Sequence, residues 1–83
     1  MKTIIRSRFK EHLYRMSLER GGETFTQKRI AEETGLMRKT VSLWLDMQKP
    51  LDRIDTSALI ALSKYVGCHP LDLLVVEEMP NDN

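Results

Sequence analysis

The chain has 83 residues, a mass of 9.7 kDa and a formal net charge of +1, with 41% hydrophobic and 30% charged residues. This length and composition fit one small globular domain and exclude two. The single cysteine, Cys68, excludes an intrachain disulfide, and no apolar run approaches the ~18 residues of a membrane span. A charge of +1 by itself argues against a nucleic-acid partner.

The first helix is predicted by an apolar stripe that recurs at three- and four-residue intervals. The stripe consists of Ile5, Phe9, Leu13 and Met16. It predicts a helix from about Ser7 to Glu19. The β-branched start Thr3-Ile4-Ile5 favours an alternative for this end, a short strand paired with the strand-like Leu74-Val75-Val76.

Four later segments begin alike, with an apolar residue before the cap that can pack against another five positions on. The pairs are Phe25 with Ile30, Leu36 with Val41, Ile54 with Leu59, and Cys68 with Leu73. Thr26 and Asp55 are favourable caps, and Pro70 suits the first helical position after His69. The pattern predicts helices over 26–34, 37–46, 56–66 and 70–74. We therefore expect an all-α, compact five-helix domain over residues 1–78, with short terminal strands as the alternative for its ends, and a flexible tail at 79–83.

The segment from Thr26 to Leu45 has the spacing of a helix-turn-helix. Ala31 is small where the two helices approach each other, and Gly35 suits a turn with positive φ. Val41 and Trp44 form an i, i+3 apolar pair that anchors the second helix.

Burying this anchor leaves one face of the second helix exposed, with Arg38, Lys39, Ser42, Leu43 and Asp46. Arg and Lys donate to guanine or to phosphates, Ser bonds either way, and an exposed Leu can contact a thymine methyl group. The chemistry of this face suits the reading of DNA. A solvated charged face remains the alternative for Arg38 and Lys39, and a dimer contact or an ordinary exposed leucine remains open for Leu43.

On these residues the chain resembles the phage repressor and Cro type (XRE-like) of helix-turn-helix regulator, whose DNA-binding domains have five helices. The resemblance runs from about Ile4 to Val76. It is carried by Thr26-Gln27, Ala31, Gly35-Leu36, Arg38, Thr40-Val41-Ser42 and Trp44, then by Leu62 to Cys68 and Pro70 to Leu74. The latter residues are most similar to a branch of small bacterial and phage regulators that have no separate ligand domain.

The resemblance implies a set of DNA contacts. It places Gln27, with Lys28 beside it, at the start of helix two, where the family contacts phosphate and braces the first side chain of the recognition helix. It places the exposed face of the second helix on the family's base-reading face, and the two residues Gln48 and Lys49 where the family often contacts backbone phosphates. The candidate DNA-binding residues are Gln27, Lys28, Arg38, Lys39, Ser42, Leu43, Gln48 and Lys49. Three features depart from the family pattern: Met37, where a Ser or Thr usually caps the recognition helix; Met47, where a Gly is frequent; and Gly21-Gly22-Glu23-Thr24, which lengthens the loop before helix two.

We expect a sequence-specific regulator of transcription that binds double-stranded DNA with helix 37–46 in the major groove. With a single recognition helix per chain, we expect a homodimer on two half-sites about one helical turn apart, ~34–36 Å. The apolar residues Leu74, Val75 and Val76 make the segment from Leu71 to Glu78 the candidate dimer surface. The alternative is a protein-binding module, antitoxin-like or adaptor, which Asp46 on the reading face and Met37 at the cap favour.

Other classes of function find no support in the sequence. No set of catalytic residues is evident, so we expect no enzyme, no cofactor and no small-molecule ligand. The candidate metal ligands Cys68, His12 and His69 lack paired spacing, so we expect no metal. We also expect no membrane association and a cytoplasmic, nucleoid-associated protein of bacterial or phage origin.

The net charge conceals a polarity along the chain. Residues 1–49 carry 11 Lys and Arg against 6 Asp and Glu, a balance of +5, whereas residues 50–83 carry 2 against 6, a balance of −4. The basic half contains the helix-turn-helix, so the near-neutral total is compatible with a DNA-facing side.

Overall fold

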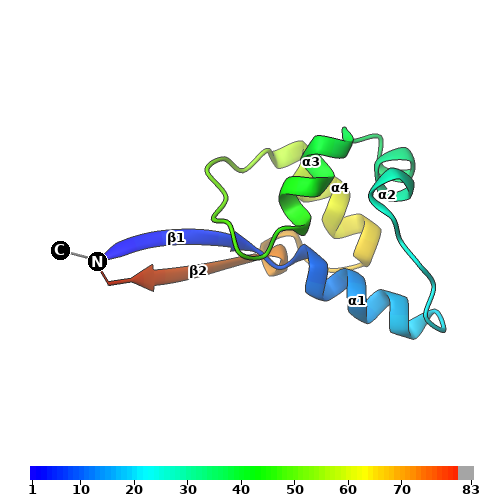
Figure 1. The fold of residues 1–83 in the computed structure, drawn as a ribbon, viewed down its shortest axis with the longest axis horizontal. Helices are drawn as coiled ribbons and strands as arrows, with labels where there is room; N and C mark the ends of the chain where they lie inside the picture. The colour runs from blue at the N-terminus through cyan, green and yellow to red at the C-terminus, as the bar shows by residue number, and fades with distance from the viewer. Residues whose placement is uncertain (81–83) are drawn as a thin grey trace.

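A computed structural model describes residues 1–80 as four α-helices, one 3₁₀ turn and a two-stranded antiparallel sheet (Figure 1). In chain order the elements are β1 (Lys2–Ser7), α1 (Phe9–Glu19), α2 (Gln27–Thr34), α3 (Arg38–Leu45), α4 (Thr56–Val66), η1 (Pro70–Leu73) and β2 (Leu74–Met79). The helices form the body of the molecule. The two strands project from it as a ribbon that carries the N-terminus at its tip (Figure 1).

The predicted five-helix, all-α fold is wrong at both ends of the chain. The fifth helix, predicted over 70–74, is a four-residue 3₁₀ turn, because Leu74 begins strand β2. The first helix begins at Phe9 rather than Ser7, and Ile5 belongs to β1. The predicted tail at 79–83 begins with Met79, the last residue of β2, and its residues 81–83 lie outside the described part of the chain.

The alternative prediction of terminal strands is confirmed, with a longer sheet than expected. β1 pairs antiparallel with β2 over six positions, and Ile5 lies opposite Val76. Arg8 N–H continues the ladder by donating to the carbonyl of Leu73 at 2.7 Å. The β-branched residues at both ends favour this extended pairing over continuation of the neighbouring helices.

The hydrophobic core lies between the four helices and η1. Its fully buried members are Phe9, Ile30, Val41, Ala58, Leu62 and Leu73. In each of the four apolar pairs predicted at the helix starts, the second residue is buried. Of the first residues, Phe25, Leu36 and Cys68 pack against the same core. None of the helices within residues 1–80 has the length and apolar character needed to cross a membrane.

Ser7, the last residue of β1, connects three elements. Its side chain is buried, with the residue 1% exposed, and its hydroxyl donates to the carbonyl of Trp44 in the last turn of α3 at 2.5 Å. The same oxygen accepts a hydrogen bond from the backbone N–H of Phe9, the first residue of α1. Because the last carbonyls of a helix have no partner within the helix, this bond satisfies a group that would otherwise be buried unpaired.

We predict that Ser7→Ala lowers the free energy of unfolding by about 1–3 kcal/mol, because the substitution leaves buried backbone groups without partners. Urea denaturation measures the change. Ser42→Ala is the matched control, because Ser42 is exposed on α3 and its removal should change stability by less than about 0.5 kcal/mol. Equal effects of the two substitutions would contradict this role of Ser7.

Candidate nucleic-acid interface

The turn between α2 and α3 has the geometry of a helix-turn-helix. Thr26 caps α2, its hydroxyl accepting from Arg29 N–H at 3.1 Å, as the sequence predicts. Gly35 ends α2 with φ of +77°, and its N–H donates to the carbonyl of Ala31 at 2.9 Å. A Cβ at this position would meet no atom within 4 Å, so the left-handed backbone, rather than lack of space, favours glycine here.

Helix α3 is anchored to the body through the side that the sequence predicts. Val41 is fully buried and Trp44 is 3% exposed, and both belong to the core. The exposed surface of α3 outside this anchor carries four of the predicted site residues: Arg38, Lys39, Ser42 and Leu43. Anchoring by two large apolar residues on an eight-residue helix holds this outer face in a fixed orientation.

The start of α3 has no side-chain cap. Met37 occupies the cap position with extended backbone and is 70% exposed, so its side chain offers no acceptor to the first turn. The chain before it is held instead by Thr34, whose hydroxyl donates to the carbonyl of Ile30 at 2.6 Å and accepts from Leu36 N–H at 3.3 Å. The first N–H groups of α3 therefore remain open next to Arg38 and Lys39.

The end of α3 is fixed by Asp46, which the sequence assigns to the exposed reading face. Its carboxylate instead accepts from the backbone N–H groups of Gln48 at 3.0 Å and Lys49 at 3.3 Å. These two bonds stabilise the charged form and lower the pKa of Asp46 below its usual value. Asp46 thus shapes the turn that presents the two residues predicted to contact phosphates. Met47 in this turn does not adopt the positive φ that a Gly favours.

Arg6 attaches the same turn to the sheet. Its guanidinium donates to the carbonyl of Gln48 and, at 3.4 Å, to that of Met47, while its Nε lies 3.1 Å from a carboxylate oxygen of Glu77 on β2. The backbone of the following loop is also bound to β1, because Leu51 N–H donates to the carbonyl of Ile5 at 2.7 Å. The ribbon and the exit from α3 therefore form one hydrogen-bonded unit.

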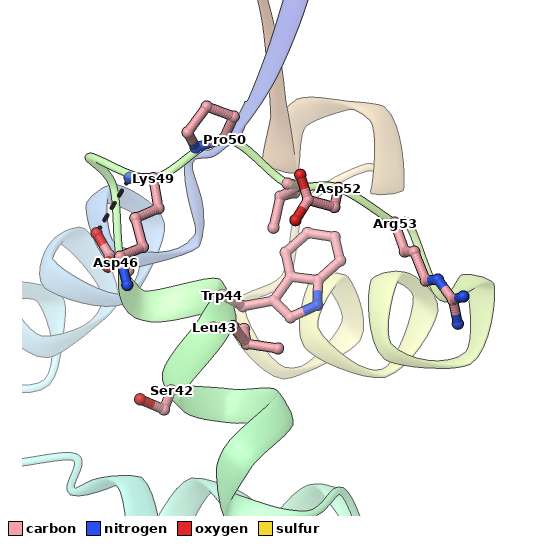
Figure 2. A pocket seen from close by; sticks show the side chains of 9 residues that line it. Ser42, Leu43, Trp44, Asp46, Lys49, Pro50, Asp52 and Arg53 are labelled. Carbon is pink, nitrogen blue, oxygen red and sulfur yellow. Dashed lines mark hydrogen bonds between the residues drawn. The ribbon is translucent and has the colours of Figure 1, made fainter.

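A groove of about 540 Å³ runs between α3 and the loop that joins it to α4. Figure 2 shows Leu43 and Trp44 on the side of α3 that faces this loop, whereas Ser42 points away from it on the other side. The lining residues are Ser42, Leu43, Trp44, Asp46, Lys49, Pro50, Leu51, Asp52 and Arg53. The groove therefore brings predicted base-reading residues together with Lys49, and adds Arg53 to the same surface.

The cations of the predicted site are not engaged in ion pairs within residues 1–80. Within residues 1–80, the ion pairs engage Arg6, Arg8, Arg15 and Arg29. Lys28, Arg38, Lys39 and Lys49, the four cations of the predicted site, form none of these pairs. Their charge is available to an external anion, and phosphate is the anion that DNA presents.

Gln27 and Lys28 are exposed in the first turn of α2, where the sequence places them. In the described part of the chain no hydrogen bond joins Gln27 to Arg38, so the bracing contact implied by the family resemblance is not formed in this structure. Arg29, which follows Lys28 in α2, connects the start of the helix to the segment before it. That guanidinium pairs with Glu23 and Glu33 and lies 4.5 Å from the centre of the Phe25 ring.

Two residues that position this surface are not identified by the sequence reasoning. Ser7 and Arg6 act on carbonyls 37 to 42 positions further along the chain, and no local pattern indicates such contacts. Arg53 is also missed, although the sequence carries a signal for it: it is a second cation in the loop that follows the predicted helix over 37–46. No group of Cys, His, Asp or Glu side chains within residues 1–80 is arranged to hold a metal ion.

The buried anchor, the left-handed turn and the unpaired basic face define a helix-turn-helix DNA-binding domain. A family model described as the Cro/C1-type HTH DNA-binding domain matches residues 22–78, and the chain belongs to this family. The resemblance drawn from the sequence is thereby confirmed, and the chain is a DNA-binding, helix-turn-helix protein of transcription regulation. The family is typically non-enzymatic. Neither a curated protein nor a solved structure gives a significant match.

The contact of Tyr65 on α4 with Glu33 on α2 generates a prediction about pH. Partial burial and then the hydrogen bond to the Glu33 carboxylate raise the pKa of Tyr65 to about 12. The phenol keeps its proton in the folded chain to a higher pH than in the unfolded chain, where its pKa is about 10. We therefore expect the stabilisation from this contact to be complete below pH about 10 and to be lost as the pH rises from about 10 to about 12.

A titration of phenolate absorbance tests this expectation in the Tyr14→Phe chain, which leaves Tyr65 as the only tyrosine. The midpoint should lie at about 12, and Glu33→Gln in the same background should move it down. An unchanged midpoint after removal of the Glu33 charge would show that the contact does not form.

Proposed function

We propose that the chain is a sequence-specific transcriptional regulator that binds double-stranded DNA with α3 in the major groove, as a homodimer. The observation that supports this most directly is the group of exposed cations on and around α3 that form no ion pair within residues 1–80, next to the exposed Ser42 and Leu43. Arg38 and Lys39 are the donors for base edges or phosphates, and Ser42 and Leu43 supply the further contacts. Lys28 with Gln27 on one side, and Lys49 with Gln48 on the other, contact the backbone.

The arrangement of the two helices supports this docking geometry. α2 crosses the backbone with Gln27 and Lys28 in its first turn, and α3 enters the groove with its outer face. The carboxylate of Asp46 is engaged with two backbone N–H groups of the exit turn. Its negative charge is therefore used to hold the backbone of the turn that carries Lys49.

The alternative, a protein-binding module that has lost DNA binding, loses one of its two supports. Asp46 favours that alternative only as a free acid on the reading face, and the structure gives the side chain a local role. Met37 at the uncapped start of α3 remains its one feature. Selection of bound sequences from a random DNA pool separates the two functions. A palindromic site supports a dimeric regulator, and absence of enrichment supports the protein-binding module.

We predict that Arg38→Ala costs about 1–3 kcal/mol of binding free energy at one base position and relaxes the preference there. Loss of the guanidinium removes donors to a base edge and leaves the remaining contacts in place. Gel-shift titrations against the selected site and its single-base variants measure the change. Arg15→Ala on α1 is the matched control and should leave affinity and preference unchanged. If Arg38→Ala behaves like this control, α3 does not read bases through Arg38.

Lys49→Ala should weaken binding to all sequences alike, because a phosphate contact carries no base information. The slope of log affinity against log salt concentration should fall by about 1. Titrations at several salt concentrations on specific and scrambled DNA provide the measurement. Lys64→Ala, on α4, removes the same charge away from the proposed contacts and should leave the slope unchanged. A change in base preference without a change in slope would assign Lys49 to a base.

A further inference from the structure

Strand β2 has one edge that pairs with β1 and another that no neighbouring strand covers within residues 1–80. Figure 1 shows β1 between β2 and the loop that joins α3 to α4, so the outer edge of β2 faces away from the body. Val76, at the middle of this strand, is 63% exposed. An open edge with apolar side chains is a template for a further strand.

The hydrogen bonds show which backbone groups point outward from this edge. Ile5 gives its carbonyl to Leu51 on the outer side of β1, so Ile5 and Val76 opposite it form a pair that exchanges no hydrogen bonds. Pairing alternates along antiparallel strands, and the same holds for Thr3 and Glu78. The N–H and carbonyl groups of Val76 and Glu78 therefore point away from β1, toward the open edge.

We propose that a second copy of this chain binds at the open edge, with the two β2 strands antiparallel about a two-fold axis through Val76. The result is a four-stranded sheet with the order β1, β2, β2, β1. This interface rests on the homodimer of the proposed function and specifies how it forms. Val76 of one copy lies opposite Val76 of the other, and the outward groups of both exchange hydrogen bonds.

The charges of the strand select this register. A two-fold axis through Glu77 or Glu78 sets identical carboxylates directly opposite each other, which destabilises a sheet. An axis through Val75 leaves only three paired positions, because β2 begins at Leu74 and Leu73 belongs to η1. With the axis at Val76, Glu77 faces Val75 and Glu78 faces Leu74, while each Glu77 keeps its ion pair with Arg6 of its own chain. The strand is thus complementary to itself.

This interface also orients the two recognition helices. Arg6 and the Leu51 bond attach the ribbon to the exit of α3, so a joined sheet fixes one α3 relative to the other. A symmetric partner gives each chain the same connection. A dimer of this kind presents two equivalent helices to a palindromic site.

Val76→Pro tests the interface, because it removes only an outward N–H that the ribbon does not use. Sedimentation over a range of concentrations should show a dimer whose dissociation constant rises about tenfold or more in this variant, as expected for loss of about 1.4 kcal/mol. Thr3→Pro is the matched control, since it removes an outward N–H from the opposite edge, and it should leave the constant unchanged. Circular dichroism confirms folding, and Val76→Lys, which sets two like charges face to face, gives a second variant should the proline unfold the ribbon.

The possible outcomes separate this interface from the proposed function. Dimers of normal strength in Val76→Pro and Val76→Lys overturn the interface, as does a wild-type chain that stays monomeric while it binds a selected DNA site. That second result leaves the regulator function standing. Dimers that are sensitive to Val76 in a chain that shows no DNA preference support the interface and overturn the regulator function.

Discussion

The hydroxyl of Ser7 joins the end of α3 to the start of the fold. It supplies the buried carbonyl of Trp44 with a donor and gives the first N–H of α1 an acceptor. Without it, the Trp44 carbonyl in the last turn of α3 would lose this hydrogen-bond donor at the contact with β1. The bond explains why β1, a short projecting strand, belongs to the DNA-binding unit. No buried side-chain polar atom in residues 1–80 is left without a partner, so this junction is fully satisfied.

The two ends of α3 are consequently unequal. Its C-terminal end is held by Ser7, by the Asp46 turn and by Arg6, whereas its N-terminal end has no side-chain cap. The cations of the candidate site flank both ends: Arg38 and Lys39 at the open end, Lys49 at the fixed end. A fixed end sets the position of the helix, and an open end leaves unbonded N–H groups where an anion can accept from them. This asymmetry suits a helix whose position is fixed by the fold at one end and whose other end is open to an anion.

The sequence predicts the parts of this fold that depend on local chemistry. Thr26, Asp55 and Gly35 act within a few residues of their own positions, and their caps and turn form as expected. The sheet depends on two segments about 70 positions apart, so it enters the sequence reasoning only as an alternative. The sequence places Asp46 at the end of the predicted helix over 37–46, but α3 ends at Leu45 and the Asp46 carboxylate turns to the N–H groups that follow, a local competition that periodicity does not resolve. Ser7 and Arg6 act across distances that no local pattern reports.

The near-neutral net charge is the sum of basic and acidic residues that lie on different parts of the fold. Arg38, Lys39, Lys49 and Arg53 form no ion pair within residues 1–80 and lie on α3 or in the loop after it, while Glu77 and Glu78 lie on the ribbon that projects from the body. Long-range attraction to phosphate is therefore weak for the chain as a whole and concentrated on one surface. A domain with little non-specific attraction depends more on base contacts and on a second copy for its affinity. The same acidic residues restrict how two ribbons can meet, so the charge that weakens long-range attraction to phosphate also restricts the register of the proposed dimer.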